Sequence, residues 1–151
     1  MRITRLLIFA LLLDSSPCLA TGSYQFADHL MKSITSDEGQ VSEKTVLEPT
    51  LYSYFSRLLR KSCQEVPGIG SIAGQDPPTF KRYTVRVVSD NDKTANVKVF
   101  SKAQTESGTE TLDLTLRLRK IDGNWKIFDA CSAGQEPHYC YRSEVMHWKC
   151  G

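Results

Sequence analysis

Residues 112–130 read LDLTLRLRKIDGNWKIFDA, and this stretch decides the fold. Its first half places a leucine at every second position, with polar or charged residues between, which is the period of a half-buried β-strand. The dipeptide Asp122-Gly123 follows, and it is the strongest short-range signal for a two-residue hairpin loop with positive φ at both positions. The second half, from Asn124 onward, is therefore predicted to pair antiparallel with the first.

The two-residue loop also predicts the register of this hairpin. The implied pairs are Ile121–Asn124, Lys120–Trp125, Leu118–Ile127 and Leu116–Asp129. Since paired residues share a face of the sheet, Trp125 and Ile127 are expected on the leucine face, which forms the core. The same register places Asp129 on that inner face, where a carboxyl group is chemically out of place.

The chain before this hairpin predicts two more strands and two main helices. Strands are expected over residues 81–89 and 94–102, on either side of the turn sequence DNDK. Apolar residues four apart indicate a helix over 23–34, and a second helix is expected to begin near Pro49, after a short helical turn at 42–47.

These elements predict an α+β fold. N-terminal helices are expected to pack on a strongly curved, antiparallel, four-stranded meander, and the C-terminal tail is expected to be stapled by disulfides. The expected organisation is a signal peptide at residues 1–20, an α+β domain at 21–130 and a cysteine-rich tail at 131–151.

The N-terminus has the layout of a secretory signal peptide. Arg2 and Arg5 form a basic region, and residues 6–13 form an apolar run that is too short to anchor the chain in a bilayer. Cleavage is expected after Ala20. The mature protein is therefore expected to be exported, with no membrane contact after cleavage.

Charge limits the class of partner. Loss of Arg2, Arg5 and Asp14 with the signal lowers the formal net charge from +2 to +1. Nucleic acid is not expected as a partner, because phosphate binding needs a clustered excess of Lys and Arg.

Four cysteines remain after the signal, and an even number in an exported chain indicates two disulfides. They are Cys63, Cys131, Cys140 and Cys150. Of the three possible connectivities, the expected one joins Cys140 to Cys150 in a local loop and Cys63 to Cys131. A zinc site is the alternative, since His138 and His147 alternate with two of these cysteines as H-x-C-x6-H-x2-C. That spacing fits no standard ligand pattern, so no metal or cofactor is predicted.

Two amphipathic helices followed by a meander that ends in Gly-x-Trp-Lys-Ile resemble the nuclear-transport-factor-two-like superfamily. That group has a cystatin-like α+β cone, in which a strongly bent sheet wraps around a helix. The resemblance covers roughly residues 26–130. Within the group, Gly74-Gln75-Asp76 ahead of the first strand and the run DGNWKI look like an uncharacterised family of bacterial exported domains. The resemblance implies a cone-shaped fold rather than an activity, and the tail from Cys131 onward departs from it.

Known enzymes of this superfamily are isomerases, dehydratases and epoxide hydrolases, and they place Asp, His or Tyr inside the cone. Asp129 is the one acid that the register places there, so it is the candidate catalytic residue. A general acid or base at this position needs a pKa raised by burial and a partner within reach. The alternative is that Asp129 lies at the end of its strand and makes ordinary hydrogen bonds in water.

The tail carries the most unusual side chains of the chain. The candidate partner-binding residues are Tyr139, Tyr141, Arg142 and Trp148, since Tyr, Trp and Arg are enriched in protein interfaces. The alternative is that the aromatic rings fold back and cover an open end of the sheet. A single mature domain of this size is expected to be a monomer or a homodimer. A homodimer would pair through the outer sheet face, where Val88 and Phe100 are apolar residues in a polar pattern.

The function favoured by these features is an exported, non-enzymatic binding module that engages a small ligand or a partner protein. A periplasmic inhibitor or immunity-type protein is a specific version of it. The alternative is a small isomerase- or hydrolase-like enzyme that uses an acid inside the cone.

Overall fold

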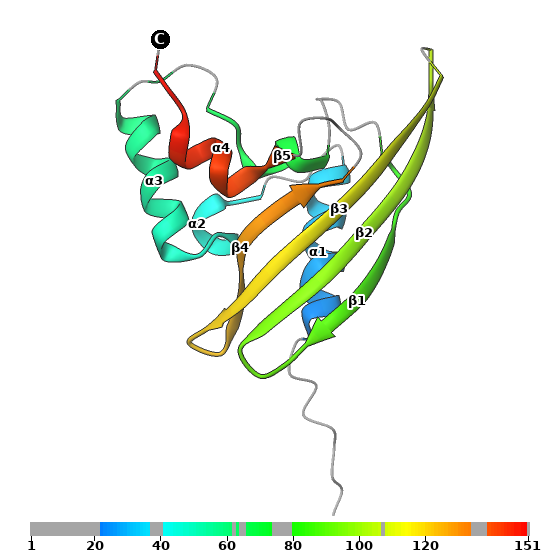
Figure 1. Cartoon of the computed structure of the whole chain (residues 1–151), viewed down its shortest axis with the longest axis horizontal. Coiled ribbons are helices and arrows are strands. Elements are labelled where there is room, and N and C mark those ends of the chain that lie inside the picture. The colour runs from blue at the N-terminus through cyan, green and yellow to red at the C-terminus, as the bar shows by residue number, and fades with distance from the viewer. Residues whose placement is uncertain are drawn as a thin grey trace, which may run out of the picture.

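An antiparallel sheet of five strands, in the order β1-β2-β3-β4-β5, forms the centre of the protein (Figure 1). The computed structural model describes residues 22–36, 41–61, 63, 66–73, 80–106, 108–133 and 139–150. The strands are β1 (Thr84–Asp90), β2 (Thr94–Thr105), β3 (Gly108–Ile121), β4 (Asn124–Ser132) and β5 (Tyr139–Cys140). The helical segments are α1 (Ser23–Thr35), α2 (Glu43–Val46), α3 (Pro49–Arg60), the 3-10 turn η1 (Ile69–Ala73) and α4 (Tyr141–His147). The expected signal peptide lies outside the described residues.

The α+β class is confirmed, but the sheet has five strands where the sequence predicts four. The additional strand, β5, contains two residues and pairs with the end of β4, with Cys131 opposite Cys140 and Ser132 opposite Tyr139. A strand of two residues has no alternation to read, which is why the sequence pattern misses it. The start of the cysteine-rich tail therefore belongs to the sheet, and the sheet remains open.

The helices α1, α2 and α3 begin close to the positions that the sequence predicts. Pro49 occupies the start of α3, where its fixed φ suits the first turn and its missing N–H is not needed. α1 places its buried side chains at Ala27, Leu30 and Met31, as the apolar spacing predicts. Within the part of the chain that the structure describes, no helix combines the length and the apolar character needed to cross a bilayer.

The turn between β3 and β4 is the predicted one. Asp122 and Gly123 have φ values of 50° and 77°, so both positions of the loop are left-handed. Three of the four predicted pairs are confirmed: Ile121–Asn124, Lys120–Trp125 and Leu118–Ile127. Trp125 and Ile127 are buried in the core, as expected.

The fourth predicted pair is wrong, because β4 contains a β-bulge at Phe128. Beyond the bulge, Asp129 lies opposite Arg117, and Leu116 lies opposite Ala130 instead. A shift of one residue moves the following side chains to the other face of the sheet. Asp129 therefore lies on the outer face, away from the leucine core in which the sequence pattern places it.

The leucine face of the sheet is covered by α1, which runs behind β1 and β2 in the view of Figure 1. The buried core side chains of the sheet are Ala95, Val97, Val99, Leu112, Leu114, Leu116, Leu118, Trp125, Ile127 and Ala130. The Tyr83 hydroxyl donates hydrogen bonds to the backbone carbonyl and to the carboxylate of Asp28 in α1, at 3.1 and 3.2 Å. These contacts hold α1 against the β1 side of the sheet.

The two disulfides are Cys63–Cys150 and Cys131–Cys140, so the expected connectivity is wrong although the four cysteines do pair. Cys140 immediately precedes α4 and Cys150 follows it. The seven residues of α4 rise by about 10 Å, which is more than the roughly 7 Å that a disulfide can bridge between Cα atoms. Cys131 and Cys140 instead face each other in the β4–β5 ladder, with a Cα–Cα distance of 4.1 Å.

Candidate functional site

Asp129 is held in place by backbone donors at the junction of β4 and α4. One carboxylate oxygen accepts hydrogen bonds from the N–H groups of Ala130 and Arg142, at 2.9 and 3.0 Å. The other oxygen lies 3.9 Å from the Arg117 guanidinium. The carboxylate is buried against its own strand and α4. These contacts hold the start of α4 on the sheet, and two backbone N–H groups engage one of the two carboxylate oxygens.

Beside Asp129 lies a second buried acid, Glu48, which joins three elements. Its two carboxylate oxygens contact the guanidinium groups of Arg142 in α4, at 2.5 Å, and of Arg119 in β3, at 3.7 Å. The backbone N–H of Glu48 also donates to the carbonyl of Ile127 in β4, at 3.0 Å. Glu48 therefore ties the start of α3 to both the sheet and the tail.

The bulge residue Phe128 lies between the two arginines. The guanidinium carbon of Arg119 is 3.7 Å from the centroid of its ring, and that of Arg142 is 4.3 Å from it. Stacking of arginine on an aromatic face is favourable, and more so when the pair is partly desolvated. We call these four residues, Glu48, Arg119, Phe128 and Arg142, the arginine–phenylalanine cluster. Sequence patterns miss it because its members come from four segments with no shared period.

Two of the candidate partner-binding residues make contacts within the protein. The side chain of Tyr141 is fully buried, and its hydroxyl donates a hydrogen bond to the Pro67 carbonyl at 3.0 Å. Arg142 contacts Glu48, the Phe128 ring and the Phe128 carbonyl. These two side chains cover the end of the sheet, as the alternative interpretation of the tail expects. Tyr139 and Trp148 are half-buried and keep part of their surface in solvent.

Substitution of Tyr141 by phenylalanine is expected to lower the free energy of unfolding by about 1 kcal/mol at neutral pH, through loss of the Pro67 hydrogen bond. Burial raises the pKa of Tyr141 above its ordinary value of 10.0. Above that pH the unfolded chain releases a proton that the folded chain retains, so the wild-type protein loses stability by up to about 1.4 kcal/mol per pH unit. The variant lacks this decline, and the two stabilities should converge and then cross in alkaline solution.

Urea denaturation across a series of neutral and alkaline pH values measures both quantities for Tyr141→Phe. Tyr83, whose pKa is raised to about 12 by burial and by Asp28, titrates in both proteins and cancels in the difference. A stability difference that stays constant across the series would contradict a buried, protonated Tyr141.

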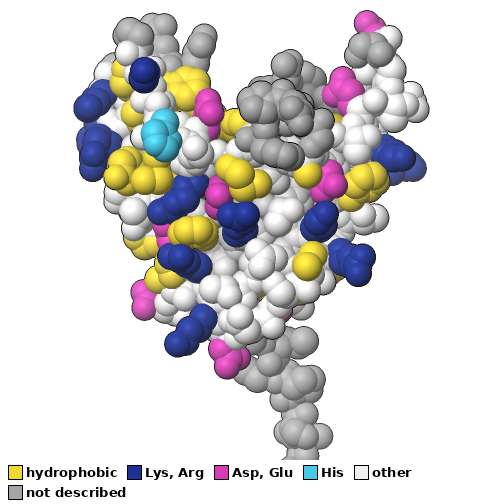
Figure 2. All heavy atoms as spheres, viewed as in Figure 1, with side chains coloured by type: hydrophobic (Ala, Val, Ile, Leu, Met, Phe, Trp, Pro, Cys, Tyr) yellow, Lys and Arg dark blue, Asp and Glu magenta, His cyan; other side chains and the backbone are white. Residues whose placement is uncertain are grey.

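The outer face of the sheet, opposite α1, carries a concentration of positive charge. We call this surface the basic sheet face. Its outward-facing cations are Arg86 in β1, Lys98 and Lys102 in β2, Arg117 and Arg119 in β3, and Lys126 in β4. The carboxylates that face them are Asp113, Asp129 and Glu48. Among the described residues, six cations against three carboxylates leave three positive charges on this face, in a chain whose formal total is +2. Figure 2 shows Lys and Arg side chains spread across the molecule in this view.

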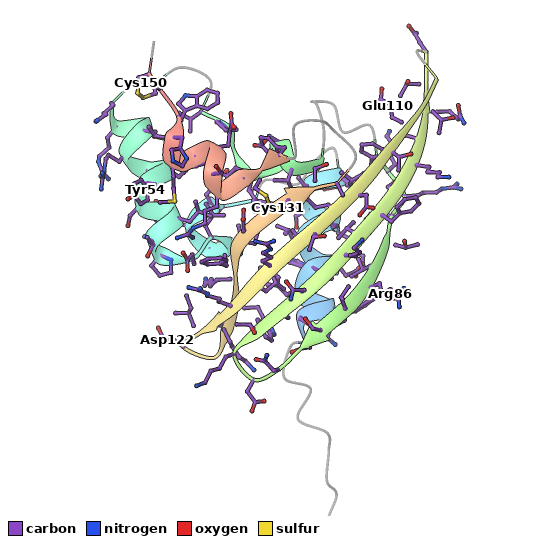
Figure 3. The ribbon with its side chains drawn as sticks, in the orientation of Figure 1. Tyr54, Arg86, Glu110, Asp122, Cys131 and Cys150 are labelled. Atoms are coloured by element: carbon purple, nitrogen blue, oxygen red, sulfur yellow. A yellow bond between two sulfur atoms is a disulfide. The ribbon has the colours of Figure 1, made fainter. Side chains whose placement is uncertain are left out.

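Two pairs of cations on this face lie directly opposite each other. Arg86 is paired with Lys98 across β1 and β2, and Arg119 is paired with Lys126 across β3 and β4. Arg86 projects away from the edge of the sheet in Figure 3, and it forms no ion pair with any described residue. Like charges directly opposite each other in a ladder reduce its stability.

Apolar side chains interrupt the charge on β1 and β2. Phe100 is 41% exposed and faces outward between two lysines of β2, and Val88, at the bulge of β1, is 59% exposed. An exposed aromatic ring beside cations is the composition that protein interfaces favour. The sequence does contain this signal, in the alternation of Lys98, Phe100 and Lys102 along one strand.

The residues of the alternative zinc site do not form a set of zinc ligands within the described part of the chain. Cys140 and Cys150 are bonded to different cysteines, and His138 lies outside the described residues. Ligand atoms of Asp129, Cys131 and Cys140 do lie within 4.8 Å of one another. The two sulfur atoms of that group are bonded to each other, so neither is available as the thiolate that zinc requires.

No protein-family model matches this chain, and no curated protein matches it either.

Proposed function

We propose that this protein is an exported, non-enzymatic module that binds another protein through the basic sheet face. The observation that carries the proposal is the like-charged pair Arg86–Lys98 on that face, since no described carboxylate forms an ion pair with Arg86. Such pairs reduce the stability of the isolated sheet. A partner that supplies carboxylates relieves the repulsion, so the same groups that weaken the free protein favour the complex.

The disulfides support the proposed export of the protein. Two disulfides are typical of oxidising compartments, and residues 1–20 have the pattern of a secretory signal. A bacterial periplasm and an inhibitor or immunity-type role suit a small, disulfide-bonded exported domain. Helices that precede an antiparallel meander support a place in the nuclear-transport-factor-two-like superfamily, with its cone-shaped domain.

The enzymatic alternative is less well supported, because its candidate residue lies on the outer face of the sheet. Asp129 shares that face with Arg117, and one of its carboxylate oxygens accepts hydrogen bonds from two backbone N–H groups. A general base needs a free lone pair within reach of a substrate proton. The contacts of Asp129 favour a positioning role at the start of α4.

Site-specific photo-crosslinking in the cells that produce the protein tests the proposed function. A photoreactive phenylalanine analogue in place of Phe100 is expected to yield a covalent adduct with a second protein upon illumination. The matched control carries the same analogue in place of Arg60, which is exposed at the end of α3. Adducts from both positions or from neither would overturn the proposal, and so would an adduct of twice the mass of the chain.

A further inference from the structure

We infer that the partner docks an extended acidic segment on strand β2, with an apolar side chain flanked on each side by a carboxylate two residues away. This inference rests on the proposed function and names the chemistry of the partner.

The spacing comes from three consecutive outward positions of β2. Lys98, Phe100 and Lys102 alternate with the buried side chains Val99 and Ser101, so all three point away from the core. Outward positions of a strand are about 7 Å apart, and an extended partner segment has the same repeat. The Lys102 ammonium group lies 5.8 Å from the centroid of the Phe100 ring. An apolar side chain on that ring therefore brings its flanking carboxylates to the two ammonium groups.

On the neighbouring strands, the side chains opposite Phe100 and Lys98 are threonines and charged residues. Phe100 lies opposite Thr84 in β1 and Asp113 in β3, and Lys98 lies opposite Arg86 and Thr115. The contact between Lys98 and Asp113 is 3.7 Å, longer than a hydrogen bond, so Lys98 can turn to a partner carboxylate. Arg86 adds a second cation beside Lys98 for the same carboxylate.

Two other occupants fit the surface less well. A second copy of the chain would bring the same excess of cations against this face, and like charges suppress such an association. Nucleic acid or an anionic lipid layer calls for a dense cluster of Lys and Arg, whereas the described residues of this face leave three net positive charges spread over four strands.

Synthetic peptides test the inference directly on the mature protein. The probe is the capped peptide Thr-Glu-Thr-Leu-Thr-Glu-Thr, titrated into isotopically labelled protein at low ionic strength while amide chemical shifts are recorded. We expect the shifts to centre on Lys98, Phe100 and Lys102. A peptide of the same composition with adjacent glutamates, and one with lysine in place of glutamate, are the matched controls, and both are expected to bind more weakly.

Substitutions in the protein complete the test. The double variant Lys98→Glu/Lys102→Glu is expected to weaken binding on the order of tenfold, since each exposed ion pair contributes up to about fivefold and is replaced by repulsion. Phe100→Ser is expected to weaken binding of the leucine peptide more than it weakens binding of an analogue that has serine in place of leucine. The variant Arg60→Glu/Lys61→Glu makes the same charge change on α3 and is expected to bind as the wild type does.

Equal affinity for the two glutamate isomers, for the lysine peptide or for the Lys98→Glu/Lys102→Glu variant would overturn the inference. So would tighter binding to phosphatidylglycerol vesicles or duplex DNA than to the peptide, with shifts on the same residues. If crosslinking at Phe100 captures a partner protein while these peptides show no selectivity, the inference fails and the proposed function stands. If the peptides are selective but no protein is captured at Phe100, the proposed function fails.

Discussion

Replacement of both Cys63 and Cys150 by serine is expected to lower the free energy of unfolding by about 4–5 kcal/mol. The two residues are separated by 87 positions, so their disulfide removes a large loop-closure entropy from the unfolded chain. The bond also joins the end of the tail to the segment that follows α3, and it keeps α4 close to the rest of the fold. Urea denaturation followed by the fluorescence of the buried Trp125 measures the loss.

The matched control is Cys131→Ser/Cys140→Ser, whose disulfide spans only nine positions. The same entropy relation gives about 2–3 kcal/mol for this shorter loop. Peptide mapping of the unreduced wild type should recover both bonds in this connectivity. Equal losses for the two variants, or a mapped Cys140–Cys150 bond, would contradict the proposed constraint of the long loop.

The disulfide connectivity depends on a helix that the local sequence does not predict. Cys140 and Cys150 are close in the chain, and proximity alone favours a bond between them. The intervening residues form α4, whose length holds the two cysteines apart. Apolar periodicity over seven residues is too short to predict that helix, so the pairing could not be worked out from the tail alone.

The hairpin was predictable because its determinants lie within the turn. Asp122 and Gly123 select the loop, and the alternation of leucines selects the buried face. The bulge at Phe128 instead coincides with contacts from distant residues. Arg119 comes from the neighbouring strand and Arg142 from the tail, and both stack on its ring. No local sequence pattern predicts such contacts or the bulge, and the prediction that Asp129 lies on the inner face was therefore wrong.

The basic sheet face could have been predicted in part. The residues between the leucines of β3 include Arg117 and Arg119, and β2 alternates Lys98 and Lys102 with buried positions. Within any single strand, these cations are typical of an ordinary solvent-exposed face. Their significance depends on the register, which places Arg86 against Lys98 and Arg119 against Lys126.

Substitution of Glu48 by alanine is expected to lower the free energy of unfolding by about 2–3 kcal/mol. Removing one member of a buried ion pair costs about 3–5 kcal/mol when the remaining charge is left without a partner. Here the remaining charges belong to Arg142 and Arg119, whose side chains are 21% and 49% exposed and can turn partly to water. The expected loss is therefore smaller than that for a fully buried pair. Urea denaturation at neutral pH measures it.

Asp113→Ala is the matched control, because Asp113 forms an exposed ion pair with Lys98 on the same sheet. Its loss should be about 0.5 kcal/mol or less, as for other surface pairs. Glu48→Gln should fall between the two, since an amide oxygen can still accept a hydrogen bond from Arg142 but carries no charge. If Glu48→Ala costs no more than Asp113→Ala, the arginine–phenylalanine cluster does not anchor the tail. The stability of the tail would then have to come from the disulfides and the burial of Tyr141.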